Sequence, residues 1–445
     1  MRINMLLAAL GLLAGTAHAA TINVPGDYPT IQDAVDVAVN GDHVVVAPGT
    51  WTGTGDSVVD LLGKSIQVSS SDGAAVTFID GQDQRRGVHC SGGETSGTVL
   101  KGFTITNGLA IDALSEGGGI RVAAGASPSI VDCTIVGNKA WRGPGLMLHG
   151  TAIVTGCQVL FNQTHDNTSP NGYGGGIYCL ADAVITECDI SENGSYWGAG
   201  MTLQDCDAQV TDCTMSGNSA VQGGAVYVRN QSPGFFGCSL HGNMAEYGGA
   251  VYMFTDSSPT FAGCSMHDNV SAGFAGAVAA YLTGPAIFDN CTIRNNLAGG
   301  SGGGFWIYLS QSTMEIVNCT IVSNTAGGTG GAVYSDLGDA TLAGSLVCDN
   351  SLDQLTGPWV DGGGNTITET CVSGACCDGA DCTVLTQFEC DAIPGSTWLG
   401  DGSTCDGCLA PNAGACCLQE GLRGASCIIT DPVSCEGLGG DWQGS

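Results

Sequence analysis

The chain has 445 residues, including 72 glycines and 23 cysteines, and its 42 acidic residues greatly outnumber its 11 lysines and arginines. The formal net charge of −31 argues against a nucleic-acid-binding protein, because such proteins need basic surface to neutralise phosphates. Hydrophobic residues make up 43% of the chain, so it is not an acidic disordered segment. This many cysteines favours an oxidising compartment over the cytosol.

Residues 1–19 are typical of a secretory signal peptide. Arg2 supplies the positive charge, an apolar stretch runs from Met5 to Ala14, and Ala17-His18-Ala19 has the small-residue spacing of a cleavage site. No later stretch reaches the ~18 consecutive apolar residues of a transmembrane helix. We therefore expect a secreted or cell-surface protein whose mature chain has no transmembrane segment.

Residues 20–57 are expected to form an N-terminal cap and a first strand. Ile31, Ala34, Val35 and Ala38 recur at the spacing of one face of a short helix. A stack of strands leaves an apolar end that must be covered against water and against pairing with other chains. This amphipathic helix is the predicted cover.

Internal repeats dominate residues 58–370. A Cys-x-hydrophobic-x-x-Asn motif occurs at Cys133–Asn138, Cys157–Asn162, Cys188–Asn193, Cys213–Asn218, Cys238–Asn243, Cys264–Asn269, Cys291–Asn296 and Cys319–Asn324, with degenerate copies at Gly102–Asn107 and Ser345–Asn350. Tetrads such as Gly223-Gly224-Ala225-Val226 lie between the motifs. A period in this range, with short β-like runs, predicts stacked coils. Three strands per coil make a parallel β-helix, and roughly 12 coils at ~4.8 Å give a rod of about 60 Å.

The repeated asparagines and cysteines are expected to be structural. Stacked asparagines form side-chain ladders and tolerate sharp corners. The eight cysteines of the motif are either buried thiols or disulfides, and we favour thiols because the Cβ atoms of stacked strands lie wider apart than a disulfide prefers. A repeated column of cysteines is not the arrangement of a catalytic nucleophile.

These motifs resemble known families. The Gly-Gly-Ala-Val-type tetrads alternate with a hydrophobic-x-x-Asn signature. This alternation resembles the polymorphic outer-membrane protein repeat, which forms a right-handed parallel β-helix. Residues 24–35 and 44–51 are similar to the opening of many secreted bacterial β-helix proteins, including pectin esterases and polysaccharide lyases. The resemblance implies an all-β, right-handed parallel β-helix of the pectin-lyase-like fold.

The strand that begins each coil predicts a candidate binding surface. One of its faces is apolar and must point inward. The outward face carries a stripe of aromatic residues, at Tyr178, Tyr227, Tyr252, Trp306 and Tyr334. Aromatic rings beside small residues form a flat groove on which sugar rings can stack. The alternative is ordinary aromatic packing between coils, because strands favour aromatic residues.

A second outward column is predicted on the third strand of the coil, at His241, His267 and Arg294. A cationic stack on an acidic protein could bind an anionic uronate, or these could be plain solvated residues. Two inserts, Leu109–Glu116 and Gln163–Tyr173, interrupt the rod at one corner. Loops on a rigid scaffold often carry function, so these are candidate partner contacts.

The enzyme hypothesis has little sequence support. We find no carboxylate pair like those of polygalacturonases and no second Gln-Asp motif like those of pectin esterases. The one dense polar cluster contains Arg85, Arg86 and His89 with Asp80 and Asp83, and the turn at Asp80 favours a structural role for it. We predict no catalytic residue, no metal site and no cofactor, although weak Ca²⁺ association would suit the acidity.

Residues 371–445 are expected to be a separate Cys-rich tail with 11 of the 23 cysteines. Two copies align from Gly374-Ala375-Cys376-Cys377 and from Gly414-Ala415-Cys416-Cys417. The tail has no histidine, so disulfides are favoured over zinc, and small units of this kind need such cross-links. The second copy ends before a counterpart of Cys405, so we expect either a truncated chain or an incomplete copy.

The sequence is compatible with three functions. The leading hypothesis is an exported, non-catalytic protein for adhesion or for glycan or surface binding. The second is a lyase or hydrolase acting on acidic polysaccharides, and the third is a structural spacer. The predicted partner is a polysaccharide or a cell-surface component, and not nucleic acid.

Overall fold

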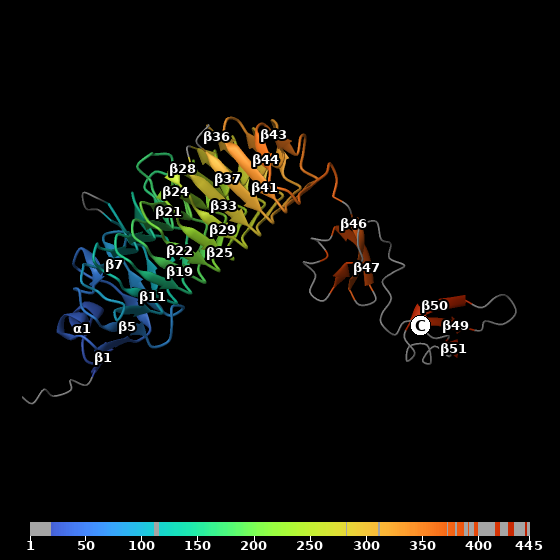
Figure 1. The fold of residues 1–445 in the computed structure, drawn as a ribbon. Helices are drawn as coiled ribbons and strands as arrows, with labels where there is room; N and C mark the ends of the chain where they lie inside the picture. The colour runs from blue at the N-terminus through green and yellow to red at the C-terminus, as the bar shows by residue number, and fades with distance from the viewer. Residues whose placement is uncertain are drawn as a thin grey trace, which may run out of the picture. The chain divides into compact units, whose positions relative to one another are not determined.

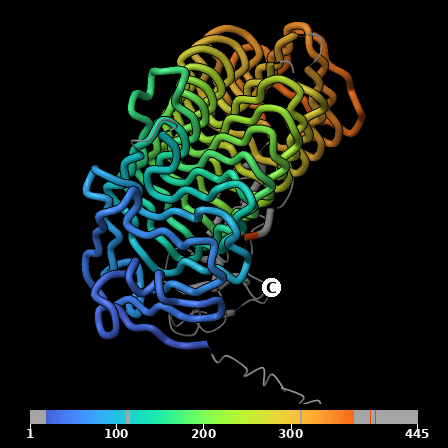
Figure 2. The backbone as a smooth tube through the Cα atoms, turned by 90° about the vertical axis from the view of Figure 1, so that its left-hand side faces the viewer, coloured from blue at the N-terminus to red at the C-terminus, as the bar shows by residue number. Residues whose placement is uncertain are grey.

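The computed structural model describes residues 19–110, 115–281, 283–309 and 312–371, together with the strands of the tail. Residues 1–368 and 369–445 form two units. The described residues of the first unit coil into a right-handed parallel β-helix of about 13 turns, and the successive coils stack along one axis (Figure 1, Figure 2). The predicted signal peptide lies almost entirely outside the described residues.

Three long parallel sheets run the length of the solenoid in the described part of the chain. The first, sheet A, has fourteen strands in the order β1 (Thr21–Val24), β2 (His43–Val46), β5 (Gln67–Ser70), β8 (Val99–Lys101), β11 (Ser129–Val131), β15 (Ile153–Thr155), β19 (Val184–Thr186), β22 (Gln209–Thr211), β25 (Gly234–Phe236), β29 (Thr260–Ala262), β33 (Pro285–Asp289), β37 (Thr313–Val317), β41 (Asp339–Ala343) and β44 (Trp359–Asp361). Its inward residues stack coil upon coil, as Phe235 does on Phe261 with ring centroids 4.5 Å apart.

Sheet B follows sheet A in each coil and carries the predicted cationic column. Its thirteen described strands are β3 (Gly49–Trp51), β6 (Thr77–Asp80), β9 (Thr104–Thr106), β12 (Thr134–Val136), β16 (Gln158–Leu160), β20 (Asp189–Ser191), β23 (Thr214–Ser216), β26 (Ser239–His241), β30 (Ser265–His267), β34 (Thr292–Arg294), β38 (Thr320–Val322), β42 (Leu346–Cys348) and β45 (Thr366–Ile367). Each strand is short because a left-handed residue turns the chain on either side, as Gly237 and Gly242 do around β26.

Sheet C begins each coil and positions the candidate site. Its twelve described strands are β4 (Ser57–Asp60), β7 (Arg86–Cys90), β10 (Ile120–Val122), β14 (Leu146–Leu148), β18 (Ile177–Cys179), β21 (Met201–Gln204), β24 (Val226–Gln231), β28 (Val251–Ser257), β32 (Val278–Tyr281), β36 (Phe305–Tyr308), β40 (Val333–Ser335) and β43 (Leu355–Thr356). The small residues before these strands are needed for close packing, since a Cβ atom on Gly176 would lie 2.6 Å from the carbonyl oxygen of Gly200.

Short strands form two further sheets at the corner between sheets B and C. They are β13 (Lys139–Ala140) with β17 (Gln163–Thr164), and β27 (Met244–Ala245), β31 (Val270–Ser271), β35 (Leu297–Ala298) and β39 (Thr325–Ala326). The outward residues Met244, Val270 and Leu297 are aligned in register and partly exposed.

The asparagine ladder is present as predicted. In each step the side-chain amide of one asparagine donates to the Oδ1 atom of the next, and that Oδ1 also accepts the preceding backbone N–H, as between Asn218 and Asn243. Both side chains are fully buried. One predicted register was wrong: Thr104 pairs with Thr134, which aligns Phe103, not Gly102, with Cys133. The backbone of Gly108, not Asn107, then donates to Asn138.

The cysteine column consists of buried free thiols, as the strand spacing predicted. Eleven described cysteines are free and buried, namely Cys90, Cys133, Cys157, Cys179, Cys188, Cys206, Cys213, Cys238, Cys264, Cys291 and Cys319. The thiols of the repeat motif donate to backbone carbonyls of the preceding coil, as Cys238 does to Val210 at 3.5 Å. The thiols therefore fill space in the core and donate hydrogen bonds to backbone carbonyl oxygens at the ends of strands.

Helix α1 (Ile31–Val37) covers the N-terminal end of the solenoid. Thr30 caps it by accepting the N–H of Asp33. Ile31, Ala34 and Val35 are buried in the main core, so the predicted apolar face is the face that packs. Ala38 lies just beyond the helix as its C-terminal cap. No helix in the described residues is long and apolar enough to cross a membrane.

The tail folds separately from the solenoid. Strands β46 (Ser373–Asp378), β47 (Asp381–Thr386) and β48 (Thr397–Trp398) form one antiparallel sheet, and β49 (Gly414–Leu418), β50 (Ser426–Thr430) and β51 (Asp441–Trp442) form another. The two sheets share one strand order, with the vicinal cysteines in the central strand. Cys348, Cys371 and Cys390 are disulfide-bonded.

Candidate functional site

A cavity of ≈ 1190 Å³ opens between α1, the segment Thr52–Asp56 and the first strands of sheet C. Ligand-binding cavities are commonly of this order of size. We name it the N-terminal cavity. Its charged lining consists of Asp33, Asp36, Asp56, Asp60, Arg85, Arg86, His89 and Arg121. Three of the chain's 11 basic residues therefore line this one cavity in a strongly acidic protein.

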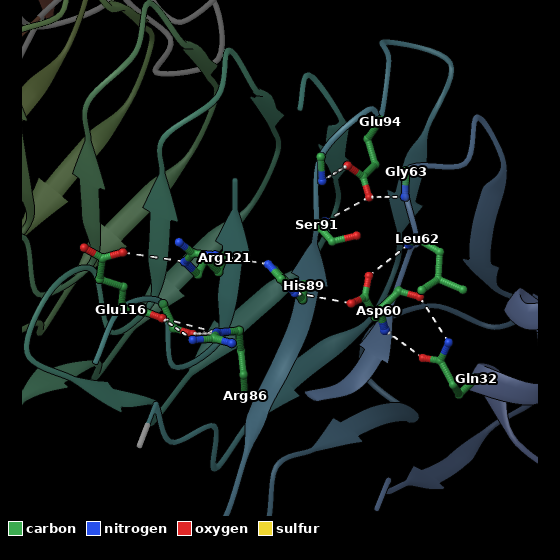
Figure 3. Close-up of polar contacts among 12 residues, drawn as sticks. Gln32, Asp60, Leu62, Gly63, Arg86, His89, Ser91, Glu94, Glu116 and Arg121 are labelled. Atoms are coloured by element: carbon green, nitrogen blue, oxygen red, sulfur yellow. Dashed lines mark hydrogen bonds and ion pairs between the residues drawn. The ribbon is translucent and has the colours of Figure 1, made fainter. Parts of the chain in front are cut away.

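Three neighbouring strands align a polar row on the floor of the N-terminal cavity. Asp60 of β4 is in register with His89 of β7, and His89 with Arg121 of β10. The Nδ1 atom of His89 lies 3.3 Å from Oδ2 of Asp60, and its Nε2 atom lies 3.2 Å from Nη1 of Arg121. Parallel pairing thus makes one contiguous Asp–His–Arg row from residues about 30 positions apart in sequence (Figure 3).

The partners of His89 assign its tautomer. A guanidinium group can only donate hydrogen bonds, so the Nε2 atom facing Arg121 must accept. The ring proton of neutral His89 then lies on Nδ1 and faces the carboxylate of Asp60. The ring is 21% exposed, so a ligand in the cavity can reach its edge.

Glu116 anchors the other end of this row. Its side chain is 3% exposed, with Nε of Arg121 and Nη1 of Arg142 each 3.6 Å from the carboxylate. His149 Nε2 approaches Oε2 of Glu116 to 2.8 Å. Because a buried carboxylate needs compensating partners, these basic side chains gather around Glu116. Arg121 lies between Glu116 and His89 (Figure 3).

Two carboxylates of the site stay ionised despite partial burial. Burial alone would raise the pKa of Asp60, but hydrogen bonds from His89, the N–H of Leu62 and Ser91 outweigh it and lower the pKa. Burial opposes ionisation of Glu116 too, and the hydrogen bond and charge of His149 with the charges of Arg121 and Arg142 hold its pKa below the ordinary value. Asp60 and Glu116 are therefore both ionised at neutral pH.

Other polar residues near the cavity are structural supports. Arg86 donates to the backbone carbonyls of Glu116 and Gly117. Glu94 accepts three backbone N–H groups, including that of Gly63 at 2.8 Å. Gln32 of α1 exchanges two hydrogen bonds with the backbone of Asp60. These contacts fix the helix and the loops that frame the row (Figure 3).

The polar cluster noted in the sequence is divided by the fold. Arg85, Arg86 and His89 line the N-terminal cavity. Asp80 instead binds the backbone of Gln82 and the side chain of Asn107 in a turn, which is the structural role expected for it. Asp60 and Arg121 were missed, because they come from separate coils and the coil lengths at this end are irregular.

The aromatic stripe continues the same outward column of sheet C. The register runs through Asp60, His89, Arg121, Met147, Tyr178, Thr202, Tyr227, Tyr252, Ala279, Trp306, Tyr334 and Thr356. The outward direction and the alignment of the predicted residues are therefore as expected. The column is polar at its N-terminal end, and five of its nine later positions are aromatic.

The expectation of an open groove at these rings was wrong. Tyr178, Tyr227, Tyr252 and Trp306 are only 4%, 2%, 6% and 8% exposed, while Tyr334 is partly exposed. Tyr227 stacks on Tyr252 with ring centroids 5.8 Å apart, and partly buried rings of two neighbouring columns pack against the stripe. Burial accordingly raises the pKa of the buried tyrosines.

The neighbouring columns carry the accessible rings. On one side they are Tyr173, Trp197 and Tyr247, linked by bridges between coils, and on the other Phe254, Tyr281 and Tyr308. We name these six residues the aromatic rows. All six are partly exposed, and Phe254, Tyr281 and Tyr308 stack at 5.5 Å per step. The aromatic residue just before the Gly-Gly tetrad was the sequence signal for the first row.

The predicted cationic column lies on a different sheet from the aromatic stripe. His241, His267 and Arg294 are aligned on β26, β30 and β34 of sheet B. Burial and the neighbouring His267 lower the pKa of His241, so the column is less cationic than expected. The two predicted groups of binding residues therefore do not form one continuous site.

The two inserts meet at one corner of the solenoid. Ser115 Oγ lies 3.2 Å from Nε2 of His165, and the His165 ring packs edge-on against Trp141 at 5.3 Å. The first insert also supplies Glu116 to the charged row and Leu109 and Ala110 to the cavity lining. This insert is therefore joined to the candidate site, although the structure does not describe residues 111–114.

A family profile described as a right handed beta helix region matches residues 60–245 and 199–372, more than two thirds of the chain. The chain belongs to the right-handed β-helix family. No curated protein matches the sequence. The described residues contain no cluster of three or more potential metal ligands.

Proposed function

We propose that this β-helix protein is exported and binds an extended polysaccharide non-catalytically, as an adhesion or surface-binding protein. The observation that supports this most is that the N-terminal cavity and the aromatic rows lie on one face of sheet C, in adjacent columns. A continuous face of this kind suits a long ligand better than a small one.

Charge favours an acidic sugar at the N-terminal cavity. Arg85 and Arg121 line the cavity, and the buried Nε atom of each has no hydrogen-bond acceptor in the described structure, although Nε of Arg121 forms a 3.6 Å ion pair with Glu116. A uronate carboxylate matches the donor geometry of such a group. Asp33, Asp36, Asp56 and Asp60 line the same cavity, so the arginines offer a local site for one carboxylate within a lining of mixed charge.

The aromatic rows supply the second part of the binding surface. Tyrosine and tryptophan combine a flat apolar face with a polar edge, which suits partly polar ligands. Trp197 is fixed by donating from Nε1 to the carbonyl of Pro170 at 2.9 Å. A fixed ring loses little conformational entropy on binding.

Retention on immobilised acidic and neutral polysaccharides tests this function. Trp197→Ala and Tyr281→Ala should weaken retention, whereas Trp359→Ala removes a 38% exposed tryptophan from sheet A and should not. Tyr227→Phe, inside the buried column, should also retain ligand. Equal retention by all four variants would exclude the aromatic rows as the binding surface. If the wild-type protein were not retained at all, the spacer hypothesis would be favoured.

A second candidate function is cleavage of an acidic polysaccharide, and the Asp60–His89 pair in the N-terminal cavity favours it. If a ligand carboxylate drew Arg121 away, Nε2 of His89 would be free to remove the proton on the carbon next to that carboxylate. The electron pair of that C–H bond then forms a C=C bond as the glycosidic C–O bond breaks, and the departing oxygen takes a proton from water. New reducing ends and unsaturated-uronate absorbance, measured with and without Ca²⁺, test this. Product that disappears in His89→Ala would establish it, and absence of product would leave binding alone.

A further inference from the structure

Two histidines on adjacent coils of sheet B form a feature independent of the proposed glycan site. His241 of β26 and His267 of β30 are paired in register. Their rings stack with centroids 4.9 Å apart and an interplanar angle of 9°. Both rings are partly exposed, so ions in solution can reach them.

The second ring nitrogen of His267 has a carboxylate partner. Nδ1 lies 2.6 Å from Oδ2 of Asp268, which places the proton of neutral His267 on Nδ1 and leaves the lone pair on Nε2. Metal-binding histidines almost always donate their other ring N–H to such a group. His241 contributes a second imidazole, stacked on the ring of His267.

The geometry suits a shared ion after a small adjustment. Zinc–imidazole bonds are about 2.0–2.1 Å long, so two ligand nitrogens on one ion lie closer together than the rings do now. A shared ion therefore requires both side chains to rotate from their stacked arrangement until the lone pairs of the two ring nitrogens converge. The rotation is feasible because the rings project from the outer face of the sheet.

We propose that His241 and His267 form a binding site for a divalent transition metal such as Zn²⁺, Ni²⁺ or Cu²⁺. Imidazole is a preferred ligand of these ions. Water completes the coordination sphere, since the described residues offer no cluster of three or more protein ligands. Asp268 is a positioning residue that holds His267 in the ligating tautomer.

The charged neighbours give the proposal a distinctive signature. Arg294 follows His267 in register, so its positive charge opposes a bound cation. The serine hydroxyls of Ser216, Ser239 and Ser265 border the pair on β23, β26 and β30 and are compatible with bound water. Removing Asp268 should therefore weaken binding, while removing Arg294 should strengthen it.

Calorimetric titration of the full chain with Ni²⁺, Zn²⁺ and Cu²⁺ tests the site. His241→Ala and His267→Ala should each abolish one binding event, and Asp268→Asn should weaken it about tenfold or more. Arg294→Ala should tighten it, and His43→Ala serves as the matched histidine control on sheet A. Nuclear magnetic resonance of the histidine rings should show both His241 and His267 shifting together.

Binding that is unchanged in the His241 and His267 variants would overturn the proposal, as would loss in His43→Ala alone. If the His241 and His267 variants weaken metal binding but Asp268→Asn does not, the positioning role of Asp268 is refuted. Because the pair lies on sheet B, glycan retention by the Trp197 and Tyr281 variants is unaffected by the outcome, so the two proposals fail separately.

Discussion

Substituting one asparagine of the internal ladder measures how strongly the coils are joined. Asn243 makes four side-chain hydrogen bonds: its amide donates to Met215 O and to Asn269 Oδ1, and its Oδ1 accepts from the backbone and side chain of Asn218. Each bond contributes about 0.5–1.5 kcal/mol net. In Asn243→Ala, the backbone N–H of Asn218 also loses its acceptor in a fully buried position. We expect a destabilisation of about 3–5 kcal/mol.

Hydrogen exchange read by mass spectrometry provides the assay. Since each 1.36 kcal/mol is tenfold in an equilibrium constant, amides of the coils around Asn243 should exchange roughly a hundredfold to several thousandfold faster. The effect should be local, because each coil of a solenoid contacts only its neighbours. Ser239→Ala, at a half-buried serine of β26 in the same coil, is the control. Equal exchange in the two variants would show that the ladder does not stabilise the stack.

Three further changes test the site and the fold. Glu116→Gln should destabilise the protein at neutral pH, because the pKa of Glu116 is held below its ordinary value of 4.5 in the folded protein and its charge therefore stabilises the fold. In denaturation series at decreasing pH, the difference in stability between the variant and the wild type should vanish as Glu116 becomes protonated. A difference that stays constant with pH would contradict this. Thr30→Ala should lower thermal stability by about 1 kcal/mol through loss of the N-terminal cap of α1, whereas Thr30→Ser should not. The eleven free thiols should resist N-ethylmaleimide until the protein is denatured, and peptide mapping that finds them labelled in the native protein would refute their burial.

Local chemistry explains why much of the fold could be predicted. The Cys-x-hydrophobic-x-x-Asn repeat specifies inward and outward positions, and left-handed corners require residues such as Gly237. The apolar spacing of Ile31, Ala34 and Val35 likewise identified the capping face of α1. These features depend on neighbours within one coil, so sequence spacing is sufficient to find them.

The first degenerate repeat shows where such spacing stops being informative. Phe103 stands where later coils have cysteine, and a one-residue shift was not visible without the pairing of Thr104 and Thr134. Only the backbone hydrogen bonds between coils define that register, because the motif residues that mark it elsewhere are absent.

The candidate site could not be predicted from the sequence, because its residues are brought together only by the tertiary structure. Asp60, His89 and Arg121 come from three coils of unequal length, and only parallel pairing places them in one row. Burial of the aromatic stripe was equally hidden, because an outward direction does not reveal whether side chains from adjacent columns cover it, as they cover Tyr227 and Tyr252. The sequence by itself determined the stacked coils and the inward and outward faces of their strands, because both follow from short-range periodicity. The accessible surface and the charged cavity depend on contacts between coils, which short-range periodicity does not encode.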